Sequence, residues 1–182
     1  GDTSMSQLKV NSIVPVGGLP SGSNGGIIQV KQTVKKDVFS TSISSNTNSG
    51  DTGLNVSITP SSNSNKILIS AQVMVSGSGQ ETIGLTLFNG GSLVTDALAD
   101  ADGNRGRTAI AGLSESDGGM SQVLSFNYLH SPSSTSEQTY GIRLKYFAGA
   151  SITIYMNRVQ SDDNQSFRAR GASYLTAMEV TV

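Results

Sequence analysis

The single histidine, His130, is the residue on which most acid–base or nucleophilic catalysis in this chain would depend. It follows an alternating apolar run and precedes Ser131 and Pro132. A Ser-His-Asp arrangement would require it, but the glycine–serine segment 77–79 lacks the G-x-S-x-G pattern that presents a nucleophilic serine. We therefore interpret His130 as a surface or edge-strand residue, and we expect no enzyme activity.

An acidic cluster between positions 96 and 104 carries the oxygen ligands that a hard cation prefers. The candidate metal ligands are Asp100, Asp102 and Asn104. Their spacing fails the EF-hand template, because the glycine comes too early and no glutamate follows at the twelfth position. The alternative is a turn in which Asp and Asn side chains bond their own backbone. We expect no cofactor, and the sequence leaves open whether a metal ion binds.

Five arginines flank this cluster and a second polar loop at 162–164. Arginine forms planar, two-pronged hydrogen bonds with carboxylates, so we expect ion pairs between the loops or between subunits rather than ligand contacts. If the loops do bind a ligand or receptor, the candidate residues are Asp102, Asn104, Arg105, Arg107, Asp162, Asp163 and Asn164. The other flanking arginines are Arg158, Arg168 and Arg170.

Other chemistries find little support in the composition. The absence of cysteine excludes disulfides, thiolate catalysis and Cys-based zinc sites. A net charge of −1 gives no electrostatic reason to bind nucleic acid. A carboxylate pair for glycoside cleavage is spatial and could still form, but the chain has no tryptophan and only 5% aromatic residues to stack on sugar rings.

Alternating apolar and polar residues predict strands throughout the chain. The clearest case is 66–76, where Ile67, Ile69, Ala71, Val73 and Val75 would share one face. Asn89-Gly90-Gly91 predicts a hairpin turn, because Asn and Gly tolerate positive φ. We expect an all-β domain, an antiparallel β-sandwich or jelly roll. Its strands are predicted at 28–34, 37–43, 54–58, 66–76, 82–88, 92–95, 107–111, 122–130, 139–146, 152–157 and 172–181.

Residues 1–26 differ from the rest of the chain. An apolar stretch with Leu8, Val10, Ile13 and Val14 precedes a Gly/Ser-rich segment that is typical of a flexible linker. We predict an arm and linker over 1–26, which would dock on a neighbouring subunit or a larger particle, and a β-sandwich over 27–182. The start of the chain lacks the basic and apolar regions of a signal peptide. We therefore expect synthesis in a cytosol, with release by another route such as viral lysis.

Four segments, in order, resemble the C-terminal domains of phage tail fibres and related virion structural proteins, especially those of marine cyanophages and pelagiphages. The most specific is Leu54 to Val75, with Thr59-Pro60-Ser61-Ser62-Asn63-Ser64-Asn65-Lys66 at its centre. The others are Met5 to Pro15, Gly25 to Val30 with Phe39 to Ser42, and Ile154 to Arg158 with Ala172 to Val180. The loop from Asp102 to Arg107 also matches a recurring one.

The resemblance implies a virion fibre or tip, a homotrimer of β-sandwiches that contacts a glycan or outer-membrane receptor on the host surface. It supplies no catalytic motif. The long shaft that precedes this domain in many fibres is not present here, which leaves tail, capsid vertex or another adaptor open as the attachment point. The alternatives are a capsid-decoration or head-fibre protein without a receptor, a glycan depolymerase, and a secreted lectin-like module. No apolar run of about 18 residues predicts membrane insertion.

Overall fold

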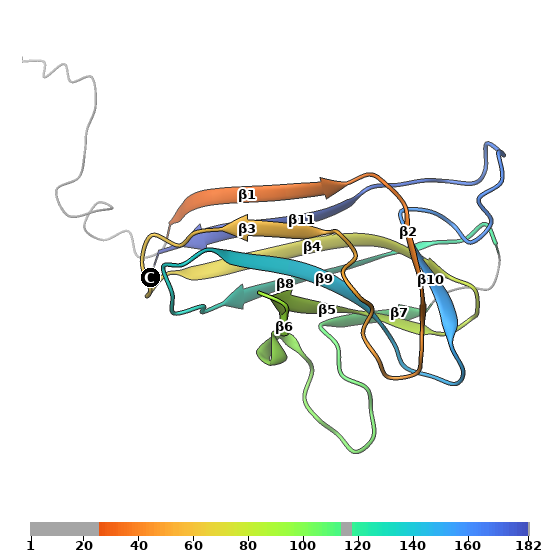
Figure 1. Ribbon diagram of the computed structural model, residues 1–182, viewed down its shortest axis with the longest axis horizontal. Coiled ribbons are helices and arrows are strands. Elements are labelled where there is room, and N and C mark those ends of the chain that lie inside the picture. The colour runs from red at the N-terminus through yellow and green to blue at the C-terminus, as the bar shows by residue number, and fades with distance from the viewer. Residues whose placement is uncertain (1–25, 114–117, 182) are drawn as a thin grey trace, which may run out of the picture.

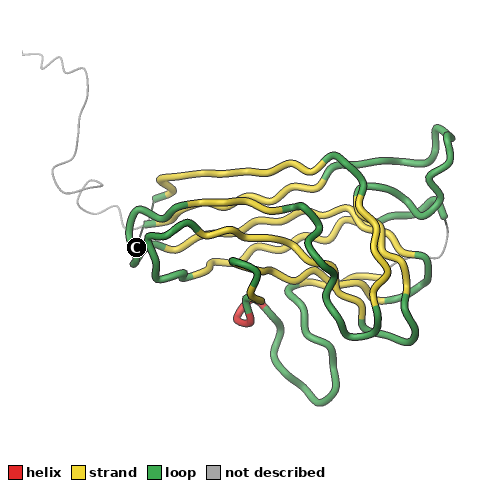
Figure 2. Tube along the Cα trace, in the orientation of Figure 1, coloured by secondary structure: helices red, strands yellow, loops and turns green. Residues whose placement is uncertain are grey.

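The computed structural model describes residues 26–113 and 118–181. They form a sandwich of two antiparallel β-sheets packed face to face (Figure 1). Strands and loops account for nearly all of the described chain, with one turn of 3-10 helix at Thr95–Ala97 (Figure 2). The predicted all-β sandwich is therefore confirmed. No helix among the described residues is long and apolar enough to span a bilayer.

The first sheet, which we call sheet A, is organised around its longest strand, β4 (Lys66–Gly77). Ile69 of β4 pairs with Tyr128 on one side and Ala177 on the other, so β4 lies inside the sheet. Toward its C-terminal end, β4 pairs with β10 instead of β11. The remaining strands of sheet A are β1 (Ile27–Lys35), β2 (Phe39–Ile43), β8 (Gln122–His130), β10 (Ile152–Met156) and β11 (Ser173–Val180).

The second sheet, sheet B, is organised around the pair β5–β9. Strand β5 continues into β6 through a two-residue loop, in which Gly90 and Gly91 adopt φ of 56° and 83°. These positive φ values confirm the predicted hairpin turn. The strands of sheet B are β3 (Asn55–Ile58), β5 (Thr82–Asn89), β6 (Ser92–Leu93), β7 (Ile110–Leu113) and β9 (Gln138–Tyr146).

The core lies between the facing surfaces of the two sheets. All five β4 residues predicted to share a face, from Ile67 to Val75, are buried. They pack against buried side chains of β5 and β9, namely Ile83, Leu85, Leu87, Tyr140, Ile142, Leu144 and Tyr146. The period-2 pattern therefore identified the inward face of each central strand correctly.

Three strand predictions were wrong by two or more residues at a boundary. The predicted strand 37–43 begins only at Phe39. The predicted strand 107–111 begins three residues later, at Ile110, because the Thr108 hydroxyl donates to the Leu85 carbonyl oxygen before regular pairing starts. The predicted strand 92–95 pairs only at Ser92 and Leu93, since the chain then turns into the 3-10 helix.

Glu179 is a buried carboxylate on the inward face of β11. Its Oε1 accepts hydrogen bonds from the Ser61 amide at 2.6 Å, the Ser61 hydroxyl at 2.7 Å and the Asn65 side-chain amide at 2.7 Å. Burial alone would raise the pKa of Glu179, but the hydrogen bonds from Asn65 and Ser61 more than offset this and lower the pKa below its ordinary value. Glu179 thus fixes the 59–65 loop, which lies at the centre of the segment from Leu54 to Val75.

We expect Glu179→Gln to lower the free energy of unfolding by about 1–3 kcal/mol at neutral pH, because the hydrogen bonds lose their charged acceptor. The folded pKa lies below the ordinary value of 4.5. The extra stability of the native protein over Glu179→Gln is therefore fully present above that value and is lost as the pH falls through the folded pKa. Urea unfolding over a pH series would show whether the stabilities of the native protein and Glu179→Gln approach each other at low pH. Exposed Glu137 supplies the control Glu137→Gln, and equal stability of all three proteins at neutral pH would contradict the prediction.

Candidate recognition loops and surface pockets

The domain has two distinct ends. At the near end, the Gly26 amide donates to the Thr181 hydroxyl at 2.9 Å and the Thr181 amide donates to the Gly26 carbonyl at 3.0 Å. Strand β1 then runs for nine residues, or about 30 Å, to Lys35, which pairs with Ser173. The loop that precedes Ser173, residues 157–172, therefore lies at the far end of the sandwich (Figure 1). We call it the far loop.

Asn157 fixes the base of the far loop. It is fully buried and has a φ of 64°, in the left-handed region that Asn tolerates better than most residues. Its side-chain amide donates to the carbonyls of Lys35 and Asp37, both at 2.9 Å, while its side-chain oxygen accepts from the Ser173 hydroxyl. Its backbone carbonyl accepts from the Gly171 amide at 3.1 Å, so both ends of the loop are held together.

Asp162 is held between two arginines of the far loop. Arg170 donates to both carboxylate oxygens, at 3.0 and 2.6 Å, and Arg158 Nη1 lies 3.0 Å from Oδ2. The hydrogen bond from Arg170 is the main cause that lowers the pKa of Asp162. The Arg158 guanidinium also stacks on the ring of Tyr155, 4.2 Å from its centroid. This cluster gives an exposed loop a defined shape.

The outer part of the far loop presents an aromatic ring to solvent. Phe167 is 65% exposed, and the Arg168 guanidinium lies 4.8 Å from its ring centroid. Arg168 Nε also donates to Asp163 Oδ1 at 2.9 Å. A concave cavity of about 490 Å³ lies here, lined by Asp162, Asp163, Asn164, Gln165, Arg168 and Arg170. Side-chain amides and guanidinium N–H groups beside an exposed ring suit hydrogen bonding to a hydroxyl-rich or acidic ligand.

The 96–107 loop does not lie beside the far loop. It projects from the margin of sheet B (Figure 1), and Asp102 pairs with Arg105 at 2.5 Å while Arg107 Nε donates to the Ala99 carbonyl at 2.6 Å. Around the candidate ligands Asp100, Asp102 and Asn104, as elsewhere among the described residues, three or more His, Asp or Glu side chains do not converge.

The expected ion pairs between the two polar loops are wrong for the described residues. Each carboxylate of these loops that forms an ion pair does so with an arginine of its own loop, because residues three to eight positions apart already meet across the turn. What the far loop does contact is Gly118, in the connection between β7 and β8, whose carbonyl oxygen accepts from the Ser161 amide at 2.9 Å. Positions 114–117, like the predicted docking arm with Leu8, Val10, Ile13 and Val14, lie outside the described residues.

His130 occupies the edge-strand position that the sequence predicted, at the end of β8. Its Nδ1 lies 2.8 Å from the hydroxyl oxygen of the buried Tyr140, and the two rings meet edge to face at 5.6 Å. Burial lowers the pKa of His130 below its ordinary value, which favours the neutral ring. A cavity of about 260 Å³ adjoins it, lined by Asn89, residues 92–96 and His130. The hydrogen bond to Tyr140 indicates a packing role for this histidine.

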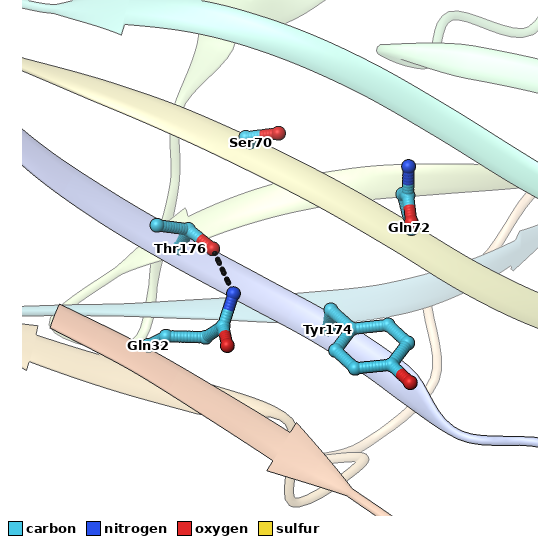
Figure 3. Close-up of a pocket in the computed structure, with 5 residues that line it drawn as sticks. All are labelled: Gln32, Ser70, Gln72, Tyr174 and Thr176. Carbon is cyan, nitrogen blue, oxygen red and sulfur yellow. Dashed lines mark hydrogen bonds between the residues drawn. The ribbon is translucent and has the colours of Figure 1, made fainter.

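A third concavity lies on the outward face of sheet A (Figure 3). It has a volume of about 290 Å³ and is lined by Gln32, Ser70, Gln72, Tyr174 and Thr176. The Gln32 amide donates to the Thr176 hydroxyl at 2.9 Å, and no lining residue is charged. Sequence reasoning missed this surface. The sequence predicts which residues of each strand face outward, but only the register between strands shows which of them are neighbours.

Comparisons with known proteins do not assign the chain to a family. No family model matches it, and no curated protein sequence does. Among solved structures, it is similar to a chain in the structure of infectious bursal disease virus, Gx strain, with a TM-score of 0.35 and 15% sequence identity. The match covers 92% of this chain and 42% of the viral chain, so this protein spans less than half of that chain's length.

We expect Asn157→Ala to lower the free energy of unfolding by about 2–4 kcal/mol, because it removes two buried and one partly buried hydrogen bond and places alanine at a positive φ. Asn164→Ala, an exposed change in the same loop, is the matched control. Urea unfolding would measure both, and limited proteolysis would report whether the far loop loosens first. Equal midpoints for the two variants would show that Asn157 does not hold the loop.

Proposed function

We propose that this protein is a virion structural protein, a tail-fibre or tip domain that attaches a phage particle to the host cell surface through its far loop. The observation that carries the proposal is the separation of the two ends. The chain enters the domain at Gly26, beside Thr181, and the far loop lies at the opposite end of β1 and β11. A domain tethered through residues 1–26 would therefore hold the far loop outward.

The surface chemistry of the far loop supports contact with a glycan or another polar receptor. Exposed Phe167 can cover the apolar face of a sugar ring, while Asn164 and Gln165 can exchange hydrogen bonds with hydroxyl groups. A single shallow site of this kind binds weakly. Several copies on one particle would raise the effective affinity through multivalency, without any new contact.

A second function is favoured by one feature of the same loop. Asp162 and Asp163 are already paired with arginines of their own loop, which leaves their carboxylates satisfied without a ligand. A loop that is stabilised internally needs no ligand to keep its shape, which is compatible with a capsid-decoration or head-fibre protein that shapes the particle surface and has no receptor. Such a protein would bind particles and not cells.

Binding of the fluorescently labelled full chain to bacteria sensitive to a particle that carries it would test the attachment function. We expect saturable binding, and we expect Phe167→Ala and Arg168→Ala each to weaken it at least about tenfold, because they remove the exposed ring and its stacked cation. Arg105→Ala is the matched control, since Arg105 is also paired with an aspartate of its own loop.

Two results would contradict this assignment. Binding lost with Arg105→Ala but kept with Phe167→Ala and Arg168→Ala would place the receptor site on the 96–107 loop. Binding to particles without any binding to sensitive cells would favour the decoration function.

A further inference from the structure

The outward face of sheet A carries three rows of side chains that cross four strands without a charge. In the first row, Val30 of β1 pairs with Met178, Met178 with Leu68, and Leu68 with Leu129 of β8. Directly paired residues share a face of the sheet, so this is a continuous apolar row. The second row is Gln32, Thr176, Ser70 and Asn127, and the third is Val34, Tyr174, Gln72 and Ser125.

Sheet B has a different outward face. Arg143 and Lys145 of β9 alternate with its buried core residues. Arg143 pairs with Asp51 at 3.0 Å, and Asn48 forms a bridge to Lys145. Part of this face is thus charged and part is covered by the chain between β2 and β3. The three uncharged rows of sheet A, with Lys66 of β4 at their border, therefore differ from the outward face of sheet B.

The edge strand β8 also carries few features that would prevent pairing with another strand, although at its start the Gln122 side-chain amide donates to the Leu113 carbonyl oxygen of β7. Its register with β4 is unbroken from Gln122 to His130, and among the described strands it pairs with β4 alone. It contains neither a charged residue nor proline. Edge strands of monomeric proteins are commonly blunted by lysines, prolines or bulges. The opposite edge, β1, has such features: Lys31, Lys35 and a register irregularity between Ile27 and Gln29.

We propose that the outward face of sheet A, together with the edge of β8, is the surface through which one copy of this chain binds a second copy. Glutamine, asparagine, serine and threonine both donate and accept hydrogen bonds, so a face of these residues complements itself. The three rows also bring no like charges together, since Lys66 lies beyond them in the next row, paired with Val180. Charged residues are depleted at interface centres. The shallow cavity at Gln72 and Tyr174 would receive side chains of the second copy.

The size of the surface fits this occupant. The three rows contribute twelve side chains, and exposed Ile27, Ile28 and Val123 extend them at the ends of the strands. Specific interfaces use about 20–30 residues on each side. The number of residues on this face approaches that range, and the backbone edge of β8 adds to it. The proposal concerns self-association and does not depend on what the far loop binds.

Sedimentation velocity of the full 182-residue chain at micromolar concentrations would test it. We expect the native chain to form a defined oligomer. Gln72→Arg and Val30→Lys each place a charge at an exposed position of the face, where the isolated chain tolerates it and a buried contact does not. Each should weaken association at least about tenfold. Ala111→Arg, at an exposed position of sheet B, is the control and should assemble like the native chain.

Circular dichroism and thermal unfolding of the variants would show whether they remain folded, and hydrogen exchange of the native oligomer should show protection at β1 and β8. A native chain that stays monomeric at micromolar concentrations would overturn the proposal. It would do so even if a different protein were found to bind this face. Folded variants Gln72→Arg and Val30→Lys that assemble as tightly as the native chain would overturn it as well.

Discussion

Buried Asn157 connects four separate stretches of the chain, and the form of the far end depends on it. Its side chain binds the carbonyls of Lys35 and Asp37 and the hydroxyl of Ser173, while its backbone amide donates to Met74. These contacts join the β1–β2 connection, β4 and β11 at the point where β10 ends. A sandwich can tolerate long polar loops only where such buried groups are fully paired, since an unpaired amide in the core is costly.

Glu179 has a comparable role at the opposite end, where it holds Ser61 and Asn65. Both residues belong to segments that resemble phage fibre proteins. These segments have an architectural role in the structure, since Asn157 closes the far loop and the serine–asparagine loop closes over Glu179. Under the proposed attachment function, receptor contacts would instead involve the outer part of the far loop.

The alternation of Ile67 to Val75 was sufficient to predict the core face of β4, because side chains in a strand have a strict period of two. The Gly90-Gly91 turn was equally readable from its φ requirement. Strand register was not, since it depends on contacts between residues distant in sequence. Without register, the row from Val30 to Leu129 is invisible, and the intraloop pairing of Asp162 with Arg158 and Arg170 cannot be separated from pairing between loops.

The adjacency of Gly26 and Thr181 has a mechanical consequence. Tension applied between these two residues would open the antiparallel β1–β11 pair like a zipper, one hydrogen bond after another. Tension between residue 26 and the far loop acts along the strands instead, and it pulls β1 and β11 past each other so that their hydrogen bonds, from Ile27 to Lys35, share the load. A domain held at its near end and gripped at its far end is thus loaded in its stronger direction.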